Sequence, residues 1–526
     1  MFGGWGKTGP VRTRSRPFAA LAGLVAAAVT IGVAELVAVA TGPRSAPLIA
    51  VGGAVVDAVP APVKQFAIDV FGVHDKLALL VGTAVLLGGF AALVGLLARR
   101  RFWLGPLGIG VFALIGVAAA VTRPGAGPAA ALPTLVGAGV AVGVFWLLLA
   151  GPLEIPAPPL DPDAEHDVAE FESGRRRFLT GAGAALGAAA LTGFAGRWLA
   201  TRRSVIAARE AIRLPVPASP AAPLPAGADL SLGGLAPFTT PNFAFYRIDT
   251  ALTVPQVDPE QWRLRITGRV RNPITLTYQD LLARPMLERD ITLTCVSNEV
   301  GGDLIGNARW LGVPIADLLA EAEPLDGADQ VVGRSVDGWT CGTPTAALRD
   351  GRDALLAVGM NGEPLPVEHG FPVRMVVPGL YGYVSACKWV TELALTSFAD
   401  FDAYWVPRGW SAQGPIKTQS RIDTPRQGKR LAAGPVTVAG VAWAQHRGIR
   451  AVEVRVDEGP WQPATLAPVP SADTWVQWVW QWPATPGEHT LQVRATDAAG
   501  VAQTGEVAPV VPDGATGWHE VQVSVH

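Results

Sequence analysis

The stretch ITLTCVSNEVGG (residues 291–302), followed by GNARWLGVP (306–314), decides how the central part of the chain is interpreted. Cys295 stands at the end of a β-rich segment and enters a loop that contains glycine. A cysteine in this position is placed like a metal ligand or a nucleophile at the mouth of a fold. The same cysteine is also compatible with a small buried hydrophobic side chain, so the residues alone leave both interpretations open.

The sequence around this stretch and the sequence after it predict two different structural classes. From 228 to 412, short apolar strands and helices alternate with turn signals, as in WRLRITGRV (262–270) and VPIADLLAEA (313–322), and predict a mixed α+β domain. From 413 to 526, alternating strands without any cysteine predict an all-β, disulfide-free sandwich. Its closely spaced tryptophans are expected on a strand face that packs in a core or an interface: Trp475, Trp478, Trp480 and Trp482.

Further motifs follow Cys295 in order. They are RSVDGW (334–339), HGFPVRMVVPGLYGY (369–383) and Lys388-Trp389. Together with Cys295 and Arg309-Trp310, they resemble the sulfite oxidase family of molybdopterin-dependent oxidoreductases over about residues 230–410. The motifs SRID (420–423) and VAWA (441–444) are similar to the immunoglobulin-like dimerisation domain of the same family.

The resemblance implies a molybdenum–molybdopterin cofactor and roles for particular residues. Cys295 would supply the protein thiolate to the metal, whose other sulfur ligands come from the pterin, and soft thiolate suits such a centre. Tyr381 or Tyr383 would lie near the metal and bind the substrate or relay a proton, and the sequence does not decide which. The residues expected to bind the cofactor, including cations for its phosphate, are Asn242, Phe245, Tyr246, Arg247, Arg309, Arg334, His369, Arg374 and Lys388.

Several of these residues have a plainer structural interpretation. Arg309 and Arg334 are equally compatible with structural ion pairs. Lys388 is compatible with a surface charge, and His369 with a turn cap. The other two cysteines have no matching role in the family, so we expect Cys341 and Cys387 to be inert packing residues.

One departure from the family pattern affects the substrate. Sulfite-oxidising members generally follow the ligand cysteine with Gly-Asn and arginines that attract a divalent oxyanion, whereas this chain has Glu299 in that region. A carboxylate there would repel sulfite. The chemistry of the family is therefore better supported than its named substrate.

The N-terminal third predicts an all-α membrane anchor at 1–200. Five apolar stretches have close to the length that a bilayer demands: 18–40, 77–98, 104–121, 131–150 and 178–199. The last is rich in Gly and Ala, which favours close helix packing. Segment 45–72 is interpreted as an interfacial or re-entrant excursion, and Glu35 as a carboxylate near the outer end of the first span.

Basic clusters predict the orientation of this anchor. Lys7 to Arg16, Arg99 to Arg101 and Arg175 to Arg177 all fall on one side, so a cytoplasmic N-terminus places everything beyond about residue 200 outside the cytoplasm. The run GRRRFL (174–179) also resembles a twin-arginine export signal, with a simple positive-inside anchor as the alternative. A Pro- and Ala-rich linker at 201–227, containing LPVPASPAAPLPA (214–226), is expected to be an extended spacer.

Composition narrows the function further. Hydrophobic residues make up 49% of the 526 residues, and the net charge of −2 argues against nucleic acid as a partner. The predicted spans contain no histidine to hold a haem, and no CxxCH motif occurs, so we expect no haem on this chain and a separate electron carrier, cytochrome or quinone-linked.

The sequence thus predicts a multi-domain protein of the plasma membrane. Its hypothesised function is two-electron oxygen-atom transfer on a small sulfur oxyanion or a sulfoxide by an extracytoplasmic catalytic domain (228–412), with a homodimer formed through the C-terminal domain (413–526). The alternative is a receptor or adhesion scaffold that has lost its cofactor, which the intact Cys295 and His369–Arg374 motifs disfavour. Transport through the helices is disfavoured because the spans contain few polar residues.

Overall fold

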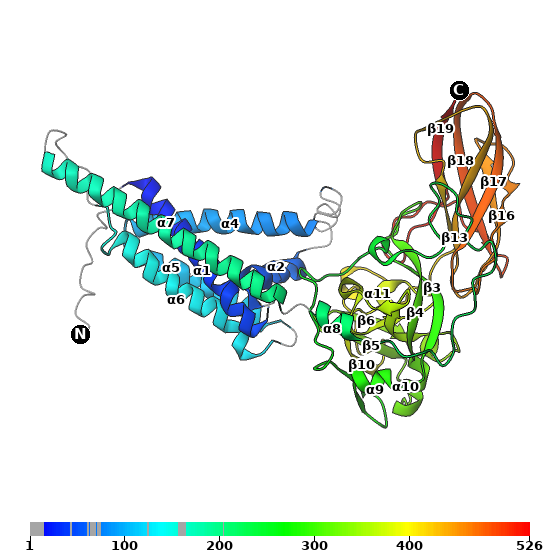
Figure 1. The fold of residues 1–526 in the computed structure, drawn as a ribbon, viewed down its shortest axis with the longest axis horizontal. Coiled ribbons are helices and arrows are strands. Elements are labelled where there is room, and N and C mark those ends of the chain that lie inside the picture. The colour runs from blue at the N-terminus through cyan, green and yellow to red at the C-terminus, as the bar shows by residue number, and fades with distance from the viewer. Residues whose placement is uncertain are drawn as a thin grey trace. The chain divides into compact units, whose positions relative to one another are not determined.

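The computed structural model describes residues 15–42, 45–59, 63, 70, 75–123, 126–155, 165–202 and 205–526. Its contacts divide the chain into two units: residues 1–204 with 251–254, and residues 205–250 with 255–526. Figure 1 shows the first unit as helices and the second as a largely stranded body. Each unit is described separately below.

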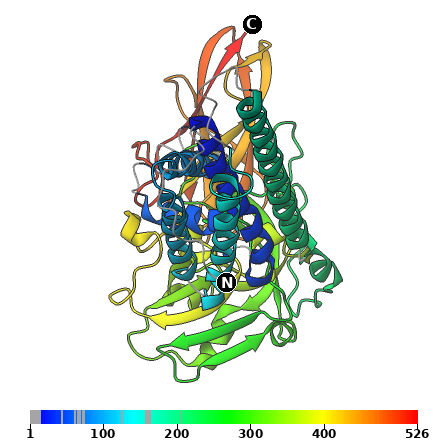
Figure 2. The same ribbon diagram turned by 90° about the vertical axis from the view of Figure 1, so that its left-hand side faces the viewer.

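The first unit is a bundle of helices (Figure 2). Five helices are long and apolar enough to cross a membrane, over Arg16–Thr41, Ala78–Ala98, Leu104–Val121, Pro128–Leu149 and Val168–Leu199. This confirms the five predicted apolar helices. The helices are α1 (Arg16–Thr41), α2 (Pro47–Ala58), α4 (Asp75–Ala98), α5 (Leu104–Val121), α6 (Leu132–Leu149) and α7 (Glu165–Arg202), with a 3-10 turn η3 (Pro128–Ala131).

Small residues allow these helices to approach closely. A Cβ atom added to Gly32 of α1 would lie 2.2 Å from the carbonyl oxygen of Ala189 in α7, and one added to Gly196 would lie 2.7 Å from the carbonyl carbon of Glu35. The two backbones are therefore in direct contact. The close packing expected of the Gly- and Ala-rich fifth segment is confirmed.

One feature of the anchor differs from the sequence prediction, and a second lies partly outside the described residues. Helix α7 begins at Glu165, so Arg175 to Arg177 lie inside a helix rather than in front of one. The polar residues before the apolar stretch continue the helix because most of them, such as Glu and Arg, are good helix formers. Of the segment 45–72, α2 forms a helix of 12 residues, whereas most of 60–72 lies outside the described residues.

The N-terminal part of the second unit contains two sheets, in the orders β2-β1-β10-β5-β6 and β3-β4-β7-β8, with β9 paired to β7. Their strands are β1 (Arg263–Gly268), β2 (Ile274–Thr277), β3 (Leu287–Thr294), β4 (Ile305–Pro314), β5 (Gln330–Ser335), β6 (Thr340–Pro344), β7 (Leu355–Met360), β8 (Glu363–Pro364), β9 (Arg374–Val376) and β10 (Val390–Thr396). The helices are α8 (Ile206–Ala211), α9 (Tyr278–Leu282), α10 (Ile315–Ala322) and α11 (Gly382–Ser385), with 3-10 turns η4 (Asn242–Ala244), η5 (Ala346–Leu348), η6 (Val367–His369) and η7 (Val406–Arg408). This part is therefore rich in β-structure, with a few short helices.

Local sequence explains several of these elements. Thr277 and Asp280 form a reciprocal capping box that starts α9. Helix α10 buries Ile315, Leu318 and Leu319 on one face, in the spacing of an amphipathic helix. Helix α10 lies within the stretch 313–322 that was quoted for the mixed α+β prediction.

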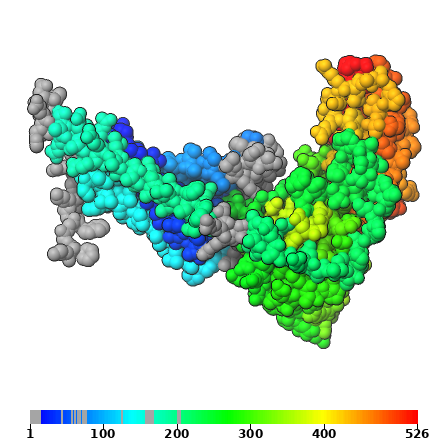
Figure 3. Space-filling model, in the orientation of Figure 1, coloured from blue at the N-terminus to red at the C-terminus, as the bar shows by residue number. Residues whose placement is uncertain are grey.

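The C-terminal part of the second unit is a two-sheet, all-β lobe, drawn from orange to red in Figures 1 and 3. The sheets have the orders β11-β13-β17-β16 and β12-β19-β18-β14-β15. Trp478 and Trp482 are buried between them and Trp480 is partly buried, so the prediction that the tryptophans pack in a core is confirmed for these residues. The strands are β11 (Gln419–Thr424), β12 (Lys429–Leu431), β13 (Gly434–Trp443), β14 (Ile449–Val456), β15 (Gln462–Pro463), β16 (Thr465–Leu466), β17 (Val476–Ala484), β18 (Gly487–Asp497) and β19 (His519–Val525).

The Pro- and Ala-rich stretch 214–226 makes backbone hydrogen bonds with the second unit. The backbone N–H of Ser219 donates to the carbonyl of Met286, and the N–H of Glu288 donates to the carbonyl of Ser219. Arg289 also donates to the Ser219 hydroxyl. This stretch therefore lies along the start of β3 and belongs to the second unit, because an edge strand has unpaired backbone groups that an extended segment can satisfy.

Candidate functional site

Cys295 directly follows the edge strand β3, as the sequence predicted. Strand β3 pairs with β4 up to Thr294 opposite Ile305, and the N–H of Cys295 then donates to the carbonyl of Leu304. The cysteine is buried, with 9% of its surface exposed. Burial raises the pKa of its thiol, and hydrogen bonds from Ser297 oppose that shift.

The loop after Cys295 is closed by its own polar groups. The side-chain oxygen of Asn298 accepts from the N–H of Leu304, and a Cβ atom at Gly302 would lie 2.7 Å from that oxygen. Arg421 of the all-β lobe donates to the carbonyl of Gly302. Glu299 in this loop is exposed, so its negative charge faces solvent.

Arg374 is a buried guanidinium at the start of β9. It donates to the carbonyl of His369 at 3.1 Å and lies 5.0 Å from the centre of the Trp310 ring. Among the described residues, no carboxylate lies within ion-pair distance of it. Burial lowers the pKa of Arg374 to about 10, because a charged group is disfavoured away from water.

His369 lies against the same cation. Its Nε2 atom is 3.0 Å from the carbonyl oxygen of Asn242. Burial, and then the charge of Arg374, lower its pKa to about 4, so the ring is neutral near pH 7.

The stretch PNFAFYR (241–247) forms an aromatic wall of the site. The ring of Phe245 stacks on Tyr246 at 5.2 Å between centroids and meets the rings of Trp310 and His369 edge-on. A Cβ atom at Gly382 would lie 3.8 Å from both the Tyr246 hydroxyl and the carbonyl oxygen of Thr294. Burial and the negative charge of a Cys295 thiolate raise the pKa of Tyr246, and the charge of Arg374 opposes this shift.

Asn242 bonds to groups at the rim of this wall. Its side-chain amide donates to Glu363, and its oxygen accepts from Asn361. Neighbouring Phe243 is exposed.

Lys388 is a buried cation rather than a surface charge. Its Nζ atom lies 2.8 Å from Asp249 and 3.2 Å from the carbonyl oxygen of Glu368. Burial lowers the pKa of Lys388 to about 8, and Asp249 opposes the shift. Arg247 contacts the same carboxylate from the exposed side.

The other two candidate arginines are engaged by acids. Arg309 forms a two-pronged ion pair with Asp290, at 3.1 and 2.8 Å. Arg334 pairs with Glu392 at 3.0 Å. Both contacts bear out the structural ion-pair interpretation, and direct contact with a cofactor stays a prediction for these residues.

The two candidate tyrosines differ in their hydroxyl partners. Tyr381 is buried, and its hydroxyl accepts from the N–H of Lys417. Burial raises its pKa to about 12, and Cys295 is among the smaller causes. The hydroxyl of Tyr383 donates instead to the carbonyl of Ser411 at 2.8 Å. Tyr381 is therefore the better placed of the two to influence Cys295.

The remaining cysteines are buried in the core, as expected. Cys341 lies on β6 with its sulfur 4.0 Å from that of Met375, and Cys387 precedes Lys388. Neither forms a disulfide.

Sequence reasoning missed residues that act only through tertiary contact. Asp249 compensates Lys388 from a position 139 residues away in the chain. Gln445, from the all-β lobe, donates to Thr294 beside Cys295. An isolated Asp and an isolated Gln carry no motif, so no local signal could have identified either one.

The site thus brings together a buried thiol, an aromatic wall and a buried cation that has no carboxylate partner in the described part of the chain. Comparison with known proteins gives a consistent result. The model of the oxidoreductase molybdopterin binding domain matches residues 251–405. Mitochondrial sulfite oxidase of Mus musculus is 31% identical over 342 residues, which cover 55% of this chain and 62% of that protein. Sulfite oxidase of Gallus gallus is 31% identical over 52% of this chain and 70% of its own length.

Two further similarities concern a bacterial relative and a solved structure. The uncharacterized oxidoreductase YuiH of Bacillus subtilis is 33% identical over 30% of this chain and 76% of its own length. The crystal structure of the sulfane dehydrogenase SoxCD from Paracoccus pantotrophus matches 52% of this chain and 75% of its own, with 26% identity and a TM-score of 0.45. The chain spans 62% of the length of the mammalian relatives that it matches.

Proposed function

Because the chain belongs to the sulfite oxidase family and carries its molybdopterin oxidoreductase domain, we propose that it is a membrane-anchored enzyme for oxygen-atom transfer on a small sulfur compound. The observation that carries the proposal is the buried thiol of Cys295 beside the aromatic wall of Phe245 and Tyr246, whose neighbour Trp310 lies against the buried guanidinium of Arg374. A molybdenum–molybdopterin cofactor requires a protein ligand for its metal and a cationic group that binds its phosphate.

The residues of the site fit this cofactor. A buried guanidinium without a carboxylate partner is costly unless an anion accompanies it, and the pterin phosphate is such an anion. Arg374 is the first candidate to hold it, and Lys388, whose charge Asp249 already balances, is the second. Phe245 and Tyr246 would line the flat pterin, and Cys295 would ligate the metal.

The cofactor, when bound, supplies the two-electron change and the oxygen exchange. The protein then has to orient the substrate and manage protons. The hydroxyl of Tyr381 keeps its proton across the physiological range, because burial raises its pKa to about 12, and it can donate a hydrogen bond to a substrate oxygen. Neutral His369 does not compete with Arg374 for an anion.

The substrate class rests on the surroundings of Glu299. Glu299 is exposed in the loop that follows Cys295. Its negative charge therefore opposes the approach of a divalent anion and does not affect a neutral sulfoxide. A Glu299→Gln variant should improve the turnover of sulfite at low salt and leave sulfoxide turnover unchanged. If both substrates respond equally, the charge of Glu299 does not select the substrate.

Electrons would pass to or from a separate one-electron or quinone-linked carrier.

We further propose that the second unit lies outside the cytoplasm. The support is the set of five apolar helices together with the basic clusters at Arg99 to Arg101 and Arg175 to Arg177. Alkaline phosphatase fused after residue 225 should be active, and the same reporter fused after residue 160 should not. Replacing both Arg175 and Arg176 by lysine tests the export route. Loss of export of the second unit would support the twin-arginine signal. Unchanged export would support a simple positive-inside anchor.

The two-sheet lobe is proposed to be the immunoglobulin-like dimerisation domain. Its two packed sheets, antiparallel except for the parallel pair β12 and β19, and its buried tryptophans are compatible with that class. Analytical ultracentrifugation of the detergent-solubilised full chain tests the homodimer. A monomer at every concentration would contradict it.

A further inference from the structure

The free edge of β3, the strand that leads to Cys295, is closed by two loops of the all-β lobe. The N–H of Thr292 donates to the carbonyl of Asp473, and the hydroxyl of Thr292 accepts from the N–H of Trp475 at 2.8 Å. The carbonyl of Thr292 accepts from the side chain of Gln445. The backbone N–H and carbonyl of Thr292 are therefore held by the other lobe, and its hydroxyl, which accepts from that lobe, also donates to Asn307 of β4.

Gln445 reaches furthest along the strand. It is completely buried, and its amide nitrogen donates to the carbonyl of Thr292 at 3.2 Å and to the hydroxyl of Thr294 at 2.9 Å. Thr294 is the residue directly before Cys295. Because hydrogen bonds between buried groups restrict the motion of both partners, this amide restrains the end of the strand from which the thiol projects.

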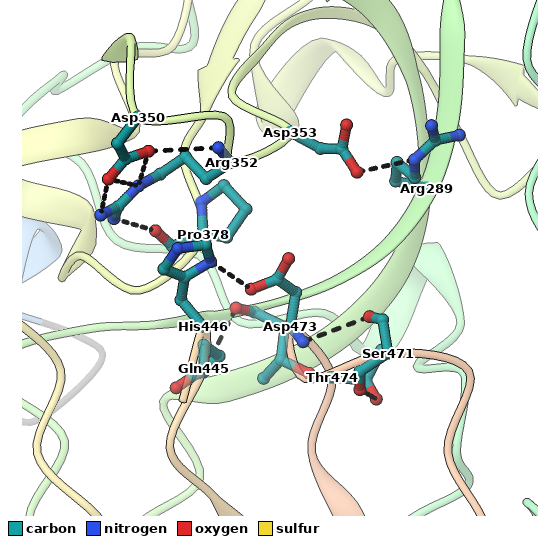
Figure 4. A network of polar contacts seen from close by, with 11 residues as sticks. Arg289, Asp350, Arg352, Asp353, Pro378, Gln445, His446, Ser471, Asp473 and Thr474 are labelled. Carbon is teal, nitrogen blue, oxygen red and sulfur yellow. Dashed lines mark hydrogen bonds and ion pairs between the residues drawn. The ribbon is translucent and has the colours of Figure 1, made fainter. Parts of the chain in front are cut away.

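The outer side of the same contact is fastened by a second polar group. Figure 4 shows His446 facing Asp473, with 3.3 Å between Nδ1 and the carboxylate oxygen. His446 also donates its N–H to the carbonyl of Ala472, and it has a left-handed backbone with φ 68°. The two lobe loops are thus tied to one another before they reach β3.

We infer that Gln445 is a positioning residue for Cys295, through its hydrogen bonds to Thr292 and Thr294. The inference rests on the proposed function, because it assigns the all-β lobe a role in positioning the metal ligand. This role is in addition to the proposed role of the lobe in dimerisation. Gln445 does not touch the thiol. It limits how far the end of β3 can move, which sets the direction of the Cys295 side chain.

A matched control is available in the same lobe. Gln477 is also completely buried and bridges the two parts of the second unit, donating to the carbonyl of Ala236 at 2.8 Å and accepting from the N–H of Leu230 at 2.7 Å. Its hydrogen-bond partners are Leu230 and Ala236, neither of which belongs to β3. Gln477→Leu therefore removes a comparable buried contact without releasing the end of β3.

The test compares Gln445→Leu with Gln477→Leu in the full chain. The first readout is the alkylation rate of Cys295 by iodoacetamide, mapped by mass spectrometry, in protein made without the cofactor. Buried Cys341 and Cys387 serve as internal controls. Gln445→Leu should raise the rate at Cys295 by about tenfold, because two lost hydrogen bonds shift a local opening equilibrium by roughly that factor, and Gln477→Leu should leave it unchanged. Equal rates in the two variants would overturn the inference.

The second readout separates this inference from the proposed function. In cofactor-loaded protein, Gln445→Leu should change the electron paramagnetic resonance signal of Mo(V), which reports the orientation of the thiolate, whereas Gln477→Leu should keep the wild-type signal. If the wild type contains no molybdenum but the alkylation difference persists, the proposed function fails and the positioning role stands. If Gln445→Leu does not fold, Thr294→Val and Thr294→Ser replace it. Faster alkylation of Cys295 in the valine variant alone supports the inference, and equal rates contradict it.

Discussion

The Nζ atom of Lys388 lies 2.8 Å from a carboxylate oxygen of Asp249, and the two side chains are only 10% and 5% exposed. A pair this deeply buried is stable only while both charges are present. The contact joins the stretch that follows the aromatic wall to the cation beside Arg374, so it fixes one side of the site before any cofactor binds.

Asp249→Asn should therefore be strongly destabilising. Loss of one partner of a buried pair typically costs about 3–5 kcal/mol, because the remaining charge is left uncompensated. Thermal or denaturant unfolding of the second unit measures the change. Glu321→Gln provides the comparison, since it breaks an exposed pair with Arg284 that should contribute less than about 1 kcal/mol. Similar losses in the two variants would contradict the assigned burial.

The stability of the cofactor-free protein should depend on pH through His369. Its folded pKa of about 4 lies below the ordinary value of 6.5, so the unfolded state binds more protons between these two values. The free energy of unfolding should rise with pH from about 4 to about 6.5 and be independent of this group above that window. His519 is shifted in the same direction, so His369→Gln should remove one of two contributions. An unchanged pH profile in that variant would show that His369 is not buried.

The core of the all-β lobe should depend on Trp478 more than on Trp480. Trp478 is completely buried, and its replacement by Ala should cost about 3–5 kcal/mol. Trp480 is only partly buried, so its replacement should cost clearly less. The measurement is the unfolding midpoint of each variant. A reversed order would place Trp480, rather than Trp478, between the two sheets.

Helix packing in the first unit makes a prediction about two glycines. A Cβ atom at Gly95 would lie 2.0 Å from the carbonyl oxygen of Ala19, whereas one at Gly110 meets nothing within 4 Å. Gly95→Ala should destabilise the bundle by about 1–3 kcal/mol because the backbones of α1 and α4 must separate. Gly110→Ala should be neutral or slightly stabilising. Unfolding in detergent, followed by circular dichroism, distinguishes the two.

The sequence predicted those features that a local pattern encodes. Five apolar stretches of sufficient length became five helices, and the β-rich residues before Cys295 became a strand that ends at the cysteine. Alternation in the C-terminal part predicted an all-β lobe. Each of these depends on neighbours in the chain, so composition and periodicity were enough.

The features that the sequence did not predict depend on distant contacts. Ser219 belongs to a stretch that was expected to be an extended spacer, and its hydrogen bonds to the edge of β3 depend on the tertiary fold. Arg309 and Arg334 occupy motif positions, but the acidic residues that form ion pairs with them lie on other strands. Gln445 and Asp249 act on the site only because the fold brings them there. Without the tertiary arrangement, none of these partners could be named.

The central claim is that this chain binds a molybdenum–molybdopterin cofactor through Cys295. The most direct test is the molybdenum and pterin content of the purified full chain, produced in a host that makes the cofactor, beside Cys295→Ala and Cys341→Ala. Stoichiometric molybdenum and pterin in the wild type and in Cys341→Ala, with loss of molybdenum in Cys295→Ala, is the predicted result. Folded wild-type protein that contains neither would contradict the account.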